Sequence, residues 1–140
     1  MAGRAFHLEI VTPDRVVLSD DAVTSVVVPG SEGYLGVMAH HAPLLTELTV
    51  GGIEIVRDDN TELTYATSGG FMEVSENRVL ILADTAEPAE EIDIERATAS
   101  KDRAEDRLRR RSEAEVDAAR AEVALMRALN RIRVAEHIQR

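Results

Sequence analysis

The chain contains no cysteine among its 140 residues, and aromatic residues make up only 3% of it. The lack of cysteine excludes a disulfide framework and any thiolate metal site. No apolar run approaches the roughly 20 residues that span a membrane, and His7 and Glu9 interrupt the apolar stretch near the N-terminus, so we expect no signal peptide. With 44% hydrophobic residues, we expect a soluble protein whose core is built from aliphatic side chains.

The sequence also lacks the motifs of nucleotide hydrolysis and nucleophilic catalysis. There is no GxxxxGK[ST], no GxGxxG and no GxSxG. His40 and His41 are adjacent, but no second group of metal-ligating residues accompanies them at a suitable spacing. We therefore expect a structural role for these histidines and a chain that is not an enzyme.

Charge is distributed unevenly along the chain. Residues 1–90 hold 15 acidic and 4 basic side chains, whereas residues 91–140 hold 11 acidic and 12 basic ones. Nucleic-acid binding usually requires a net basic domain, so it is not expected here. The arginine-rich second part suits a tail that meets an acidic surface or a phosphate, or else a solvated helical surface with many ion pairs.

Short alternating segments dominate the first part of the sequence. The period of two at Phe6, Leu8 and Ile10 predicts a strand. Polar or glycine-containing turns bound the further strands, which we expect at 15–18, 23–28, 53–57, 61–67, 71–75 and 78–82. Strands of this length and spacing predict an antiparallel β-sandwich or flattened barrel.

The pattern changes after Ala83. A polar linker carries Pro88, and from Ile92 onward there is neither proline nor glycine. The composition predicts two antiparallel helices, at 92–110 and 113–137, with Ser112 and Glu115 as a capping box at the start of the second. The expected fold class is β + α, with a sandwich domain at 1–87 and a helical hairpin domain at 88–140. Because alanine lines both helices, the hairpin core is thin; such a hairpin is either a movable element or permanently packed.

Two motifs connect the chain to a known family. The segment 31–46, SEGYLGVMAHHAPLLT, resembles the signature of the epsilon subunit of F-type ATP synthases, and the resemblance covers nearly the whole chain. It implies a non-catalytic central-stalk subunit at the cytoplasmic face of the bacterial plasma membrane. The partners would be the gamma subunit, the c-ring and the alpha/beta catalytic head, and the membrane would be reached only through the complex. The residues implied in c-ring and gamma contact are Glu32, Tyr34, His41, Pro43 and Leu44, with Tyr34 replacing the acidic residue of several relatives.

The second motif, IDIERA at 92–97, resembles the nucleotide-binding motif of ATP-binding epsilon subunits. Asp93, Arg96, Ala97 and Arg103 share one helical face, and guanidinium groups match phosphate oxygens. Asp93 could instead be only the N-cap of the helix. No cofactor is expected to be required, and the resemblance implies ATP as a regulatory ligand. The implied ATP-binding residues are Glu87, Ile92, Asp93, Arg96, Ala97, Arg103, Arg127 and Arg131.

The resemblance also implies regulation of ATP hydrolysis. In an extended state the hairpin would reach the catalytic head, where Arg109, Arg110 and Arg111 would meet acidic loops and inhibit hydrolysis. One alternative is a purely structural stalk subunit with a permanently docked hairpin and a vestigial ATP motif. Another is a free-standing module that senses nucleotides.

Overall fold

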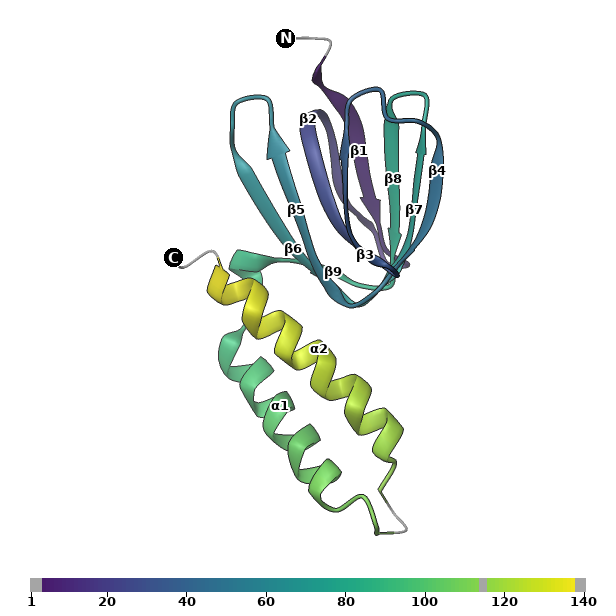
Figure 1. Ribbon diagram of the computed structural model, residues 1–140. Helices are drawn as coiled ribbons and strands as arrows, with labels where there is room; N and C mark the ends of the chain where they lie inside the picture. Colours follow the sequence, from purple (N-terminus) through teal and green to yellow (C-terminus); the bar gives the residue numbers. More distant parts are fainter. Residues whose placement is uncertain (1–3, 114–115, 138–140) are drawn as a thin grey trace. The chain divides into compact units, whose positions relative to one another are not determined.

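A computed structural model describes residues 4–113 and 116–137 of the chain (Figure 1). The chain divides into two compact units, Met1–Pro88 and Ala89–Arg140. The first unit contains the strands and the second contains the helices. The β + α fold class predicted from the sequence is therefore confirmed.

The first unit is built from nine strands. They are β1 (Phe6–Val11), β2 (Val16–Gly30), β3 (Gly33–Met38), β4 (Leu44–Leu48), β5 (Gly51–Arg57), β6 (Glu62–Thr67), β7 (Gly70–Ser75), β8 (Arg78–Ala83) and β9 (Ala86–Pro88).

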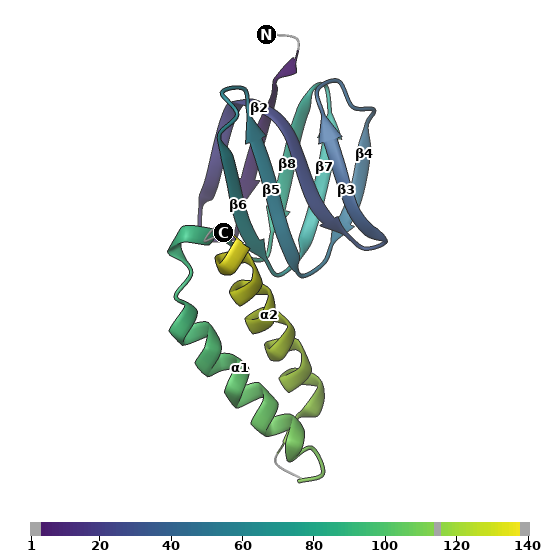
Figure 2. The same cartoon turned by 60° about the vertical axis from the view of Figure 1, so that its left-hand side comes forward.

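The long strand β2 joins two layers of a sandwich. One layer has the order β1-β8-β7-β4, and the other contains β3, β2, β5, β6 and β9 (Figure 2). The first half of β2 pairs with β1 and its second half with β5 and β3. All pairings are antiparallel except that of β1 with β8.

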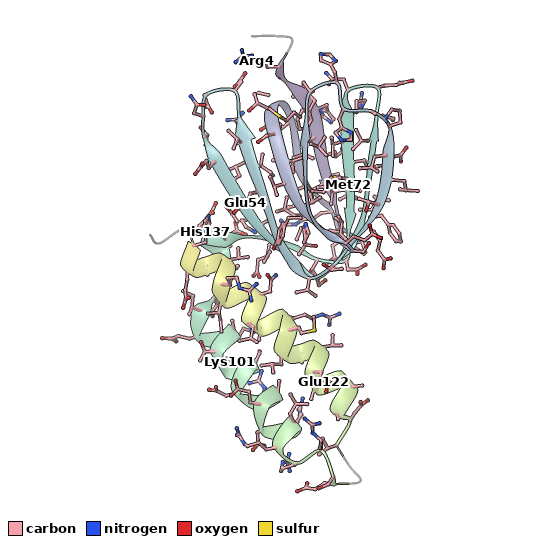
Figure 3. All side chains as sticks on the ribbon, in the orientation of Figure 1. Arg4, Glu54, Met72, Lys101, Glu122 and His137 are labelled. Carbon is pink, nitrogen blue, oxygen red and sulfur yellow. The ribbon has the colours of Figure 1, made fainter. Side chains whose placement is uncertain are left out.

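Aliphatic side chains from both layers fill the interior. Leu8, Ile10, Val26, Ile55 and Ile81 are fully or almost fully buried. Figure 3 labels Met72, which is also fully buried. The period-two pattern of β1 therefore places Phe6, Leu8 and Ile10 inside, as its alternation predicts.

Several segments between the expected strands are themselves parts of strands. Residues 19–21 do not separate two strands, because β2 continues through them with a register shift against β1. Residues 33–36 belong to β3 and pair with β2, and residues 44–48 form β4, which the sequence analysis did not predict. Pro88 lies in β9 at the edge of the sheet, where the missing N–H is tolerated.

The second unit consists of a short 3-10 turn η2 (Ala89–Glu91) and two helices, α1 (Ile94–Arg109) and α2 (Ala118–His137), which lie side by side. The Asp93 carboxylate caps α1 by accepting a hydrogen bond of 3.0 Å from the backbone N–H of Arg96. The predicted start of the second helix at 113 is wrong. Its cap is Asp117, whose carboxylate accepts from the Arg120 N–H at 3.0 Å, rather than Ser112. Glu115, the other half of the predicted capping box, lies outside the described residues.

Alanine forms the contact between the two helices. Ala97 and Ala104 on α1 are buried, as are Ala121, Ala128 and Ala135 on α2, each set at a spacing of seven residues. We call these five residues the alanine seam. Small side chains permit close approach, but each buries little apolar area, so the seam contributes little stability per residue.

Candidate functional sites

An apolar surface lies on the outer face of the β1-β8-β7-β4 layer. Leu45, Phe71 and Leu82 are 71%, 52% and 50% exposed, respectively. Phe71 pairs with Leu82 across β7 and β8. Leu45 lies opposite Glu73 on β7, and Glu73 is two residues from Phe71, so Leu45 and Phe71 share one face of the sheet. We call Leu45, Phe71 and Leu82 the apolar sheet face; exposed large side chains grouped in this way are typical of interaction surfaces.

Acidic side chains flank the apolar sheet face. Glu47 lies opposite Phe71 in the β4–β7 pair, and Glu73 lies opposite Leu80 in the β7–β8 pair. Glu9 lies opposite Leu80 on the other side of β8. A complementary partner would present an apolar ridge with basic residues beside it.

The residues expected to contact a c-ring or gamma subunit do not gather at one place. Glu32 and Tyr34 lie at or beside the β2–β3 turn, whereas His41 and Pro43 lie in the loop after β3, at the opposite end of that strand. Leu44 faces inward and packs against the core, while its neighbour Leu45 faces outward. Leu45, Phe71 and Leu82 are not among the residues expected from the sequence to contact a partner. Reading β4, β7 and β8 as alternating strands would have placed all three on one outer face.

A single amide side chain anchors the loop that carries His41. Asn77 Oδ1 accepts a hydrogen bond of 2.8 Å from the His40 N–H, and Asn77 Nδ2 donates one of 3.1 Å to the Ala5 carbonyl. Asn77 itself lies in the two-residue turn between β7 and β8, with a φ of 60°. One residue thus connects three segments that are distant in the sequence.

The hairpin presents one strongly basic side. On α1, Arg96, Arg103 and Arg107 are each offset by about a quarter turn from the alanine seam. On α2, the arginines at 120, 127 and 131 are offset by a similar angle in the same rotational sense. Because the helices run antiparallel, equal offsets of the same sense fall on the same side of the hairpin. We call these six residues the arginine face: Arg96, Arg103, Arg107, Arg120, Arg127 and Arg131.

The acidic residues of the helices project from other sides by the same geometry. They are Glu95, Asp102, Glu105, Asp106, Glu122 and Glu136. Asp93 remains near one end of the arginine face and Asp117 near the other. Counted from the connection between the helices, Arg96 lies level with Arg131, and Arg107 lies level with Arg120.

Helical geometry therefore places five of the residues expected to bind ATP on or beside the arginine face: Asp93, Arg96, Arg103, Arg127 and Arg131. Ala97 is buried in the seam beside them, and Ile92 is also buried. Asp93 does cap the helix, and Arg103 Nη2 donates to Ser100 Oγ at 3.1 Å. Glu87 belongs to the first unit, in β9, where it pairs with Ala66.

The three arginines expected to act on a catalytic head make local contacts. Arg109 Nη2 lies 3.6 Å from Asp106 Oδ1, and Arg110 Nε lies 3.3 Å from Asp106 Oδ2. Arg111 Nε donates to the Leu108 carbonyl at 3.2 Å. Exposed pairs of this kind contribute about 0–1 kcal/mol, so a partner can replace them at little cost.

Comparison with known proteins assigns both parts of the chain. Residues 5–89 match the ATP synthase Delta/Epsilon chain beta-sandwich domain, and residues 90–136 match its long alpha-helix domain. The ATP synthase epsilon chain of Desulforamulus reducens is 50% identical over 130 residues, which cover 93% of this chain and 96% of the relative. That of Moorella thermoacetica is 50% identical over 131 residues, covering 94% and 96%, respectively. The chain therefore belongs to the delta/epsilon chain family of the ATP synthase.

A solved structure agrees with this assignment. A chain of the Euglena gracilis mitochondrial ATP synthase, in a structure that contains OSCP, F1 and the c-ring, superposes with a TM-score of 0.79 at 25% identity. The match covers 98% of this chain and 82% of that one. In the part of the chain that the structure describes, no helix is long and apolar enough to cross a membrane, and no group of three or more potential metal-ligating residues is found.

Proposed function

We propose that this chain is a non-catalytic central-stalk subunit of a bacterial ATP synthase, and that its sandwich binds the gamma subunit through the apolar sheet face. Family membership supports the complex, and the exposed Leu45, Phe71 and Leu82 support the surface. Three such side chains, fully desolvated by a partner, would form the centre of an interface, where most binding energy is usually found. The flanking Glu9, Glu47 and Glu73 favour a partner with basic side chains.

The c-ring contact is assigned to the turn that carries Glu32 and Tyr34. This turn is exposed and lies at one end of the sandwich, so it can be buried by a second partner while the apolar sheet face holds gamma. His41 and Pro43 lie at the other end and would extend the gamma contact. The subunit would then be peripheral at the cytoplasmic face of the plasma membrane and would turn together with gamma and the ring.

The hairpin is proposed as the regulatory part. ATP would bind along the arginine face, with the Arg96 and Arg131 side chains and those of Arg103 and Arg127 holding phosphate oxygens and Asp93 accepting from the nucleoside. A ligand that binds only the closed hairpin shifts the equilibrium toward that form by its differential affinity. At low ATP the hairpin would open, and Arg109, Arg110 and Arg111 would meet acidic loops of the catalytic head and inhibit hydrolysis.

The docking surface can be tested with a matched pair of charge substitutions. Phe71→Asp should weaken binding of the purified chain to the gamma subunit about a hundredfold, because a desolvated carboxylate replaces an apolar anchor. The control is Met38→Asp. Met38 is 68% exposed, but it lies on β3 in the other layer. Surface plasmon resonance measures both affinities; equal affinities for the two variants would contradict the proposed surface.

A further inference from the structure

The end of the hairpin contains a cavity that the nucleotide motif does not use. It has a volume of about 330 Å³, and its lining residues are Arg107, Arg110, Glu113, Val116, Asp117, Arg120 and Ala121. Ligand pockets commonly have volumes of about 300–1,000 Å³, so this one suits a small ligand. Among the described residues that line it, three are arginines.

The two carboxylates of the cavity are already engaged. Glu113 Oε2 lies 3.3 Å from Arg110 Nη1. Asp117 Oδ1 accepts the Arg120 N–H at 3.0 Å as the cap of α2. Within residues 4–113 and 116–137, the Arg107 and Arg120 guanidinium groups have no hydrogen bond or ion pair. The cavity therefore holds two guanidinium groups whose N–H donors are not used by the described chain.

Arg107 and Arg120 are the two residues of the arginine face that lie nearest the connection between the helices. They come from different helices and line the same cavity, so that both can donate to one oxyanion bound there. Eleven residues separate Arg96 from Arg107, which is about 16 Å along the helix axis. An anion at the end of the hairpin would thus be distinct from one held at Arg96 and Arg131.

We propose that the cavity at the end of the hairpin binds a phosphate ion between Arg107 and Arg120. Planar guanidinium groups donate two parallel hydrogen bonds to tetrahedral oxyanions, and charge-assisted bonds of this kind are the strongest that an exposed site offers. Arg110 also lines the cavity but is paired with Asp106 and Glu113, and Val116 and Ala121 add apolar lining. This site goes beyond the proposed nucleotide site, because it uses none of the residues of that motif.

Inorganic phosphate is the probe for this site. The full chain, with isotope-labelled arginine, is titrated with phosphate while chloride is withdrawn to keep the ionic strength constant, and the Arg Nε–H signals are followed by NMR. We expect saturable shifts of the Arg107 and Arg120 signals, with a dissociation constant on the order of 1 mM. Absence of a saturable shift would overturn the proposal.

Substitutions then locate the ion. Arg107→Gln and Arg120→Gln should each weaken binding about tenfold, and both should fold normally, because neither side chain makes an ion pair or hydrogen bond to the described chain. Arg133→Gln is the matched control, since Arg133 is exposed on another side of α2. An equal loss in Arg133→Gln would mean general charge attraction and would overturn the site.

Two further variants separate this site from its neighbours. Arg96→Gln should leave phosphate binding unchanged, and so should Arg109→Gln combined with Arg111→Gln. Loss of phosphate binding in Arg96→Gln would move the ion to the nucleotide motif and overturn the proposal. The nucleotide proposal is tested by ATP rather than phosphate, so that either proposal can fail without the other.

Discussion

At the scale of single residues, the sandwich depends on a few polar side chains that hold distant segments together. Asp20 on β2 is one of them: its Oδ2 accepts from Arg57 Nε at 2.7 Å, and its Oδ1 accepts from the Ala22 N–H at 2.8 Å. Burial raises the pKa of the Asp20 carboxyl, but the hydrogen bonds from Arg57 and Ala22 and the charge of Arg57 together lower it below its ordinary value of 3.8.

This shift predicts a pH-dependent contribution to stability. Because the pKa of Asp20 is lower in the folded chain, the ionised carboxylate stabilises the fold above about pH 3.8. The contribution is lost as the pH falls through the folded pKa. Asp20→Asn should lower the free energy of unfolding by about 1–3 kcal/mol at neutral pH. Urea unfolding measures the difference, which should shrink as the pH falls below 3.8 through the lowered pKa of Asp20.

The exposed Asp14 provides the control for the Asp20→Asn substitution. Its carboxylate makes no ion pair within the described residues, and Asp14→Asn should change the free energy of unfolding by less than about 0.5 kcal/mol. A difference between Asp20→Asn and the wild type that stays constant from neutral to acidic pH would show that the carboxylate charge is not responsible.

Asn77 provides a second prediction at this scale. Asn77→Gly keeps a residue that accepts a φ of 60° but removes the bonds to His40 and Ala5. We expect the His40 amide to exchange its hydrogen about tenfold faster. The free energy of unfolding should fall by about 1–2 kcal/mol, since each net hydrogen bond contributes about 1 kcal/mol. Hydrogen exchange followed by NMR measures the first effect and urea unfolding measures the second.

Asn60→Gly is the control for Asn77→Gly. It also has a positive φ, of 67°, in the β5–β6 turn. Asn60→Gly therefore tests the change of residue type in a left-handed turn without the hydrogen bonds that Asn77 makes. If Asn60→Gly and Asn77→Gly had the same effect on His40 exchange, the anchoring role of Asn77 would be excluded.

At the scale of elements, the sequence predicts β1, β5, β6, β7 and β8 well, but it divides β2 and misses β3, β4 and β9. Phe6, Leu8 and Ile10 alternate cleanly because β1 has one buried face. The segment Val16–Gly30 contains Ser19, Asp20 and Asp21, which usually mark a turn, yet β2 continues because Arg57 and Ala22 satisfy the Asp20 carboxylate. Arg57 lies on β5, far from Asp20 in the sequence, and no local pattern reveals this contact.

The candidate functional sites show the same contrast between local sequence patterns and contacts from distant strands. The arginines of the hairpin are visible in the sequence, because helical spacing alone assigns them to faces. Leu45, Phe71 and Leu82 come from three strands, and only the pairing of β4 with β7 and of β7 with β8 brings them together. The family resemblance implied Leu44 as a contact residue, and because β4 was not predicted, the outward position of its neighbour Leu45 was not expected.

The arginine face leads to a prediction about nucleotide binding. Arg96→Ala should weaken ATP binding about tenfold or more, since charge-assisted bonds to phosphate contribute about 1.5–3 kcal/mol each. Arg133→Ala, on another side of α2, should have little effect. Titration calorimetry measures both affinities, and ATP should raise the melting temperature of the wild-type chain by mass action. Equal ATP affinity in the wild type and Arg96→Ala would leave only a structural role for this motif.

At the scale of the whole molecule, the basic residues are concentrated in the helical part of the chain. Residues 1–90 carry 4 of the chain's basic residues and residues 91–140 carry 12. The first unit has an extensive aliphatic core, whereas the helices meet through alanine. Because alanine buries little area, opening the hairpin is expected to cost far less free energy than unfolding the sandwich. A stable docking unit and an arginine-rich unit that opens easily suit a subunit that is held by one part and regulates with the other.

The concentration of arginine in the hairpin predicts that inhibition of ATP hydrolysis depends on the arginines beside the connection between the helices. In the assembled enzyme, replacing Arg109, Arg110 and Arg111 together by alanine should increase ATP hydrolysis at low ATP. The increase should be greater at low salt, where exposed charges are less screened. A chain that ends at Pro88 sets the upper limit, because it retains the docking surface and lacks the hairpin. Arg133→Ala is the single-charge control and should leave the hydrolysis rate near that of the wild type.

Steady-state hydrolysis assays at two salt concentrations compare the four forms, and gel filtration confirms that each remains in the complex. If the shortened chain stays bound and relieves inhibition but the triple variant does not, then the hairpin inhibits through other residues, and Arg109 to Arg111 serve only as a solvated connection. If neither form changes the rate while both stay bound, the hairpin has no inhibitory role, and the subunit acts through its sandwich alone. Relief by both, with the triple variant losing its effect at high salt, is the result expected of a basic contact with acidic loops of the head.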